Sequence, residues 1–333
     1  MNRLLALQLS ICAIGACYQT ICSMLENRQP PPGRRIDIGG YRLHYCDRGQ
    51  GSPTIVLDHS LGGVEGYLLF DRLSQLSRTA IYDRAGYGWS ERSPQPRTSH
   101  QIVLELDQLL VKAGIEPPYL LVGDSFGSYN MRLYAHCFPG KVAGLVLTDG
   151  LHEAEMLAMP KRLRLLQAFF LSGFVMSAFG SAIGAIRLLN GMGLFELLKP
   201  KLRQVPQPAI RHTKHSFLRA SHWVTMILEL WTLNRSGIQL SAAKHLGTLP
   251  IVSIRADTFL HPSIWNGFLP IQSANELHDR IHPHLAQLSS HVEILSAPGS
   301  DHFVWVEGPD VLVAAVQRLL DILHSTSAKS EYR

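Results

Sequence analysis

The sequence predicts an α/β fold, in which helices cover both faces of a mostly parallel sheet. First, short apolar runs typical of buried strands alternate with helical segments along the chain. Second, 46% of the 333 residues are hydrophobic and 17% are charged, so the chain can bury a large core and is not disordered. Third, 27 Gly and 19 Pro are scattered without a period, which excludes a collagen-like chain.

The strands are predicted from residue type and alternation. Residues 35–38 and 41–45 alternate in polarity on either side of a Gly-Gly pair, which predicts a β-hairpin. Helical periods lie between the later strands, for example after Thr98, a residue type that caps helices. Six short apolar runs predict buried strands: 54–57, 79–82, 119–122, 142–147, 251–254 and 292–295.

The chain divides into an amino-terminal segment, a core and an insertion. Residues 34–150 and 249–328 are predicted to form the α/β core. Residues 151–248 contain no good strand, and we expect them to form a helical cap inserted between two strands of the sheet. The Pro-rich residues 29–33 are typical of a linker, and residues 1–28 are predicted to be a membrane anchor or a signal segment.

Residues 4–25 carry no charge, and a run of this length can span a bilayer as a helix. Two other interpretations involve export. One is a cleaved signal peptide, and the other is a lipoprotein signal that would leave Cys17 lipidated. A buried amino-terminal helix is the fourth interpretation. We expect the protein to be membrane-associated through this segment, or exported.

A second uncharged run occupies residues 165–186 of the predicted cap. Strands before and after it belong to one sheet, so a single membrane crossing would separate strands that must pair. We expect this run to line an apolar pocket, with shallow contact with a membrane as the alternative.

The cap is also strongly basic. Residues 156–248 contain twelve Lys or Arg but only two Glu, whereas the whole chain has a net charge of +5. Such a surface attracts an anionic membrane. No aromatic-plus-basic recognition motif accompanies the charge, so no nucleic acid is expected as a partner.

Cysteine usage argues against a disulfide framework or a metal site. Three of the five cysteines lie within the first 25 residues. No C-x-x-C pair and no zinc-type Cys/His spacing occurs, so we expect neither a metal nor a cofactor.

The sequence Gly-Asp-Ser-Phe-Gly at 123–127 follows a predicted strand and opens a helical segment. G-x-S-x-G in this context is a nucleophile elbow, in which a sharp turn exposes the serine at the strand tip. Ser125 is therefore the candidate nucleophile. A serine hydroxyl needs a base at neutral pH, and His302, on the loop after the last strand, is the candidate.

An oxyanion formed at Ser125 needs backbone N–H donors. We expect one from Phe126, directly after the nucleophile, and one from Leu61, in the Gly-rich loop after strand 54–57. The acid that orients the histidine has two candidates. Asp149 lies at the tip of strand 142–147, and Asp257 lies after strand 251–254; both satisfy the order Ser, Asp, His.

Residues 34–325 resemble α/β-hydrolase fold enzymes with a helical cap, of the serine esterase and lipase type. The resemblance implies that Asp83 and Arg84 brace the fold as a pair. It is carried by five stretches of the sequence: 58–63, 82–90, 123–127, 144–149 and 300–302.

The sequence departs from this family at three points, one of which is His59-Ser60 in the oxyanion loop, where His-Gly is common. Asp124 precedes the nucleophile where a histidine is usual, and a carboxylate there would disfavour an anionic intermediate. The family's register for an acid after the seventh strand falls on Phe259, two residues beyond Asp257, so Asp149 is the favoured acid.

Together these features predict a serine hydrolase that cleaves a carboxylic ester, or a related acyl bond, through an acyl-enzyme. The apolar cap favours a small-molecule substrate with a hydrophobic part. The alternative is a catalytically weak member of the same fold that binds a ligand and signals.

Overall fold

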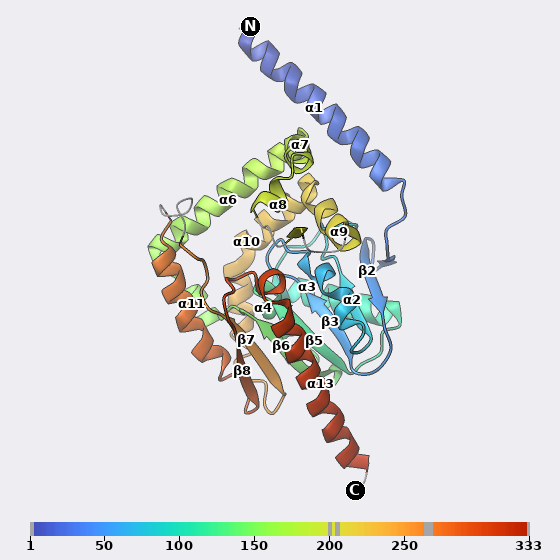
Figure 1. The fold of residues 1–333 in the computed structure, drawn as a ribbon, viewed down its shortest axis with the longest axis vertical. Helices are drawn as coiled ribbons and strands as arrows, with labels where there is room; N and C mark the ends of the chain where they lie inside the picture. Colours follow the sequence, from blue (N-terminus) through green and yellow to red (C-terminus); the bar gives the residue numbers. More distant parts are fainter. Residues whose placement is uncertain (1–2, 199–201, 204–206, 263–268, 332–333) are drawn as a thin grey trace.

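The computed structural model describes residues 3–198, 202–203, 207–262 and 269–331. These residues contain an eight-stranded sheet in the order β1-β2-β4-β3-β5-β6-β7-β8 (Figure 1). β1 and β2 form the predicted hairpin, β2 pairs antiparallel with β4, and the other neighbours are parallel, which confirms the α/β fold. The strands are β1 Arg34–Asp37, β2 Arg42–Arg48, β3 Thr54–Asp58, β4 Thr79–Tyr82, β5 Tyr119–Asp124, β6 Val142–Thr148, β7 Ile251–Ala256 and β8 Val292–Ala297.

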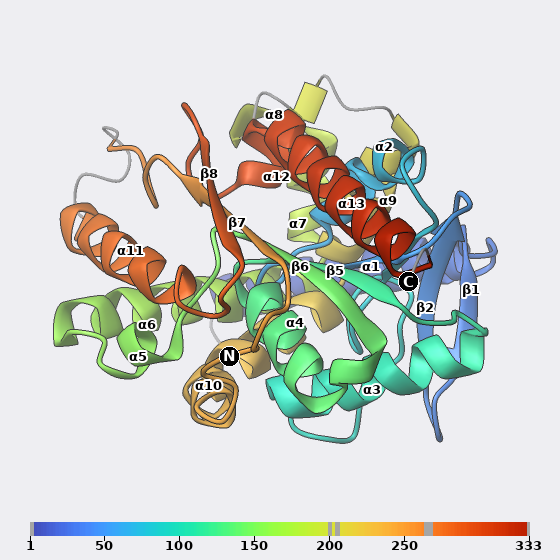
Figure 2. The same cartoon turned by 90° about the horizontal axis from the view of Figure 1, so that it is seen from below.

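The central strands are apolar throughout because both of their faces are covered. On β5, Leu121 packs into one core cluster, whereas Leu120 and Val122 pack into the other. Helices lie on both sides of the sheet in Figure 2. The first cluster includes α3 (Ser99–Ala113) and α4 (Phe126–Cys137), and the second includes α2 (Phe70–Leu73), α12 (Val304–Glu307) and α13 (Pro309–Glu331).

The insertion between β6 and β7 is helical, as predicted, and its described residues contain no strand. It packs over the edge of the sheet at which the parallel strands end. Its helices are α5 Glu153–Leu157, α6 Lys161–Ala182, α7 Ala185–Gly191, α8 Leu194–Leu198, α9 Gln207–Phe217 and α10 Ala220–Leu240. After β7, α11 (Ile271–Leu285) returns the chain to β8.

Helix α6 carries the second uncharged run and has two different faces. Leu166 is buried, and with Phe170 and Phe174 it lines a largely apolar cavity, as expected for the run. The opposite face is exposed and equally apolar. It presents Leu165, Phe169, Val175, Met176 and Phe179.

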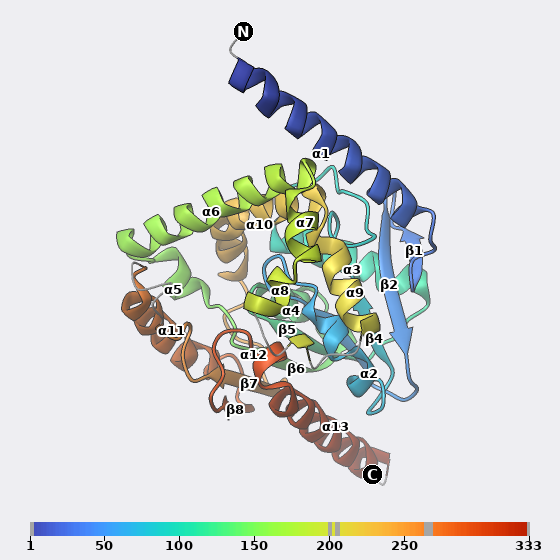
Figure 3. The same cartoon turned by 45° about the horizontal axis from the view of Figure 1, so that its top comes forward.

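Helix α1 (Arg3–Asn27) extends beyond the cap, and Figure 3 shows its amino-terminal half free of the core. The alternative of a buried helix is wrong, because its large apolar side chains are exposed. Its second half contacts the cap: Gln19 Nε2 donates to the Leu218 carbonyl at 2.8 Å, and Arg187 pairs with Glu26. Within the described residues, Leu5–Asn27 and Lys161–Ala182 are long and apolar enough to cross a membrane, a property that signal sequences share.

Candidate active site

Ser125 occupies a strained turn between β5 and α4. Its backbone has φ 48° and ψ −109°, and a positive φ is uncommon for a residue other than glycine. The flanking residues must be glycine: an added Cβ would lie 2.6 Å from the Gly127 carbonyl oxygen at Gly123, and 2.4 Å from the Asp58 carbonyl oxygen at Gly127. The Ser125 N–H donates to the Thr148 carbonyl at 2.9 Å, which fixes the turn on β6.

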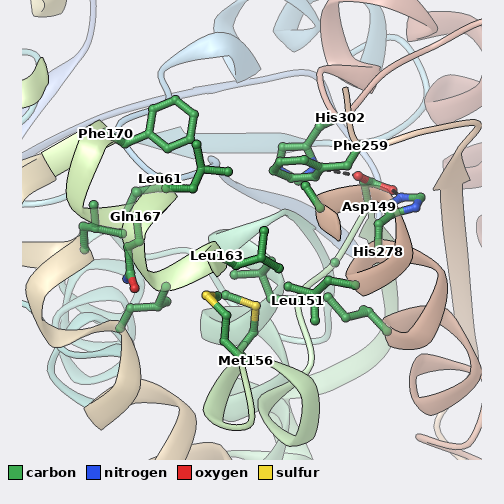
Figure 4. Close-up of a pocket in the computed structure, with 18 of the residues that line it drawn as sticks. Leu61, Asp149, Leu151, Met156, Leu163, Gln167, Phe170, Phe259, His278 and His302 are labelled. Carbon is green, nitrogen blue, oxygen red and sulfur yellow. Dashed lines mark hydrogen bonds and ion pairs between the residues drawn. The ribbon is translucent and has the colours of Figure 1, made fainter. Parts of the chain in front are cut away.

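The structure brings three of the candidate side chains into one hydrogen-bonded chain. His302 Nε2 lies 2.8 Å from Ser125 Oγ. His302 Nδ1 contacts Asp149 Oδ2, as Figure 4 shows. Ser125 and Asp149 each follow directly after a parallel strand, and His302 lies on the loop after β8. Because parallel strands end at the same edge of the sheet, residues far apart in the sequence meet there.

Asp257 does not join this chain of contacts. Its side chain is exposed, and Oδ2 accepts the backbone N–H of Gly299 at 2.6 Å. Asp257 therefore holds the loop that carries His302, whereas Asp149 contacts the His302 ring itself. Phe259 lies against that ring, with centroids 4.6 Å apart.

Two further histidines, which sequence reasoning missed, surround Asp149. His278 Nε2 lies 2.6 Å from Asp149 Oδ1, and His282 Nε2 lies 3.4 Å from the same oxygen. Burial raises the pKa of Asp149, but hydrogen bonds from His278, His282 and His302 outweigh it and hold this pKa well below its usual value. The signal in the sequence was their spacing, because residues four apart share one face of a helix.

The two candidate donors to the oxyanion are the backbone N–H groups of Phe126, in the elbow itself, and of Leu61, in the loop after β3. Phe126 is the first residue of α4, so its N–H has no acceptor within the helix. Leu61 lines the cavity beside His302. The loop that carries Leu61 is fixed by Arg84, whose guanidinium donates to the carbonyls of His59 and Ser60 at 2.8 and 2.7 Å.

Asp83 and Arg84 both brace the fold, but each does so through its own partners. The buried Arg84 bonds to Asp58 at 2.7 Å and to Glu229 at 2.9 Å, so it joins the core to α10 of the cap. Asp83 instead contacts His44 Nδ1 at 2.8 Å. The two side chains diverge because consecutive residues of an extended segment point to opposite sides.

Asp124, the unusual residue before the nucleophile, is buried. Its desolvation, together with the neighbouring carboxylates of Glu65 and Asp149, raises the pKa of Asp124 well above its usual value. A raised pKa favours the neutral acid. The expected conflict between a charged Asp124 and an anionic intermediate is therefore reduced.

The site opens into a cavity of about 180 Å³ under the cap. Asp149, His278 and His302 form one polar end, and the rest of the wall is apolar except for Gln167 (Figure 4). The apolar lining includes Leu151, Met156, Leu163, Leu166, Phe170, Phe174, Leu230, Leu233 and Leu277.

Known proteins resemble this chain in both sequence and fold. Residues 53–179 match the family model described as alpha/beta hydrolase fold. An AB hydrolase superfamily protein from Gibberella zeae is 22% identical over 267 residues, which cover 74% of this chain and 79% of that protein. The 2-hydroxymuconate semialdehyde hydrolase from Pseudomonas putida is 33% identical over 130 residues, which cover 36% of this chain and 44% of that protein.

A solved structure gives the same architecture. The enol-lactonase from Burkholderia xenovorans superposes with a TM-score of 0.58 at 17% identity, covering 86% of this chain and 100% of that chain. At this identity the likeness shows the fold alone. Two uncharacterized proteins from Bacillus subtilis are matched over only 37% and 27% of their own length.

Proposed function

Since this chain is a member of the α/β-hydrolase fold superfamily, we propose that it is a serine hydrolase that cleaves carboxylic esters with a hydrophobic part. The observation that carries the proposal is the 2.8 Å contact between His302 Nε2 and Ser125 Oγ. This distance lies within hydrogen-bond reach, as a general base requires. The contact of His302 Nδ1 with Asp149 supports it, because a carboxylate there fixes the tautomer that accepts a proton at Nε2.

The proposed reaction has two halves. Ser125 Oγ attacks the ester carbonyl carbon while its proton passes to His302 Nε2, and the carbonyl oxygen becomes an oxyanion near the N–H groups of Phe126 and Leu61. The C–O bond to the alcohol then breaks, and His302 returns the proton to the leaving alkoxide. Water, deprotonated by His302, hydrolyses the acyl-enzyme and releases the acid.

The substrate class is proposed from the cavity. Its wall is apolar apart from Gln167 and the end that carries His302, Asp149 and His278. Burial of an acyl or alkyl chain there would be favourable at roughly 25 cal/mol per Å².

We further propose that the protein acts at a membrane. Support comes from the exposed apolar face of α6 beside α1, which offers two apolar helices on the same side of the molecule. The basic residues of the cap would add attraction to an anionic surface.

The test is hydrolysis of p-nitrophenyl esters of increasing chain length by the wild type and by Ser125→Ala. We expect the wild-type kcat/KM to rise with chain length until the cavity is filled, and the variant to lose at least about 10³-fold in kcat. If the folded wild type cleaves none of the esters, the ligand-binding alternative would replace this proposal.

A further inference from the structure

We propose that Asp149, His278 and His282 form a binding site for a divalent transition-metal ion such as Zn²⁺, and that its occupancy slows the reaction at Ser125. The metal site goes beyond the proposed function, whereas the inhibition rests on it.

The three proposed ligand atoms lie close together, on the side of Asp149 that faces away from His302. His278 Nε2 and His282 Nε2 are 3.1 Å apart, and they lie 2.6 and 3.4 Å from Asp149 Oδ1. A point about 1 Å from the plane of these three atoms lies about 2.1 Å from each of them, which is the distance that Zn²⁺ takes to imidazole nitrogen and carboxylate oxygen. Histidines at i and i+4 of a helix are also a common way to present two imidazoles to one ion.

The ring nitrogens of His278 and His282 have too few hydrogen-bond acceptors around them. Both imidazoles approach the same carboxylate oxygen, so a single acceptor serves two Nε2 atoms. The Nδ1 atoms of both rings are buried and have no hydrogen-bond partner among the residues that the structure describes. A cation would use both Nε2 lone pairs together, and His278 Nδ1–H would then face Asp279 Oδ1, 3.7 Å away, as an outer-shell partner.

Charge and access also suit an ion. Asp149 supplies a buried carboxylate, the kind of anionic ligand that a divalent cation requires. The cavity provides a path, because Asp149 and His278 line its wall. Three protein ligands would leave a further coordination position for water.

The inhibition follows from the shared carboxylate. Asp149 uses Oδ2 for His302 and Oδ1 for the two other histidines. An ion on Oδ1 would reduce the negative charge that stabilises protonated His302 during the reaction. His302 would then accept the Ser125 proton less readily.

The test measures Zn²⁺ affinity by competition with a chromophoric chelator, using the full chain after EDTA treatment and dialysis. His282→Gln removes one ligand, and His100→Gln, at an exposed position on α3, is the matched control. We expect His282→Gln to weaken binding at least about 10-fold, the least that losing even an outer-shell partner costs, and His100→Gln to bind like the wild type. Because His44, Asp83 and His212 also lie close together, only the difference between variants reports on this site.

Two further measurements keep the proposal falsifiable if His282→Gln fails to fold. Co²⁺ bound to the wild type should show the visible bands of a four- or five-coordinate ion, and their absence would overturn the site. Zn²⁺ should slow wild-type ester hydrolysis at least about 10-fold, and EDTA should restore the rate. Binding that depends on His282 in a protein without esterase activity would support the site and refute the proposed function. Equal Zn²⁺ affinity of folded His282→Gln and wild type would refute the site.

Discussion

Asp149 contacts the ring of His302, whereas Asp257 accepts the backbone N–H of Gly299, and this difference favours Asp149 as the proposed acid. We expect Asp149→Asn to lower kcat by about 10³–10⁴-fold, because an amide no longer stabilises protonated His302 or fixes its tautomer. Asp257→Asn is the matched control and should retain most of the activity. Comparable losses in both variants, each folded by circular dichroism, would show that this assignment is wrong.

The raised pKa of Asp124 predicts how the activity depends on pH. A carboxyl group with a raised pKa stays neutral to a higher pH and gains its charge only as the pH rises further. That charge, next to the nucleophile, would oppose the oxyanion, so wild-type activity should fall toward alkaline pH. Asp124→Asn cannot ionise, and its kcat/KM should hold to higher pH. Superimposable pH profiles for the two proteins would contradict this role of Asp124.

At the scale of elements, the ion pair between Arg84 and Glu229 joins α10 of the cap to the loop that carries Leu61. We expect Glu229→Leu to lower the free energy of unfolding by about 3–5 kcal/mol, because it leaves a buried guanidinium short of one partner. Chemical denaturation measures this change. Glu293→Leu, which breaks a partly exposed ion pair with Arg318, is the control. It should lower the free energy of unfolding by at most about 1 kcal/mol.

If Glu229→Leu lowers the free energy of unfolding no more than Glu293→Leu does, Asp58 alone compensates the Arg84 charge. In that case the cap would not depend on this ion pair for its position over the cavity.

At the scale of the whole molecule, α1 is fixed to the cap rather than loosely tethered. Gly15 lies so close to the Ile183 carbonyl that an added Cβ would be 2.2 Å from it, and Arg219 Nη2 donates to Asn27 at 2.8 Å. The direction of α1 is therefore linked to that of α6. If one helix enters a lipid surface, the exposed face of the other is brought toward it.

This arrangement predicts that α6 binds lipid without help from α1. A chain that lacks residues 1–28 should still float with anionic phospholipid vesicles in a density gradient. Exchange of both Phe169 and Phe179 for Asp in that chain should abolish flotation, because charges on the exposed face oppose insertion. Loss of flotation on removing residues 1–28 alone, in a folded chain, would leave α1 as the only membrane contact.

The sequence predicted the sheet well because the physical signals are local. A strand such as 119–122 is buried on both faces and is therefore apolar throughout, and the Gly residues at 123 and 127 mark a turn that no side chain would allow. The meeting of Ser125 and His302 at one sheet edge follows from the parallel topology.

Long-range partner choice could not be predicted in this way. Arg84 pairs with Glu229, 145 residues away, and Asp149 contacts His278, 129 residues away. No local pattern specifies such pairs, because they depend on how the cap and α11 pack on the core. The burial that raises the pKa of Asp124 is likewise a property of the folded chain.

The most direct test of the account is to identify the residue that a fluorophosphonate probe modifies, by peptide mass spectrometry of the labelled protein. We expect a single modified residue, Ser125, with labelling lost in His302→Ala and strongly slowed in Asp149→Asn. Labelling at another residue, or equal labelling of the wild type and His302→Ala, would contradict it.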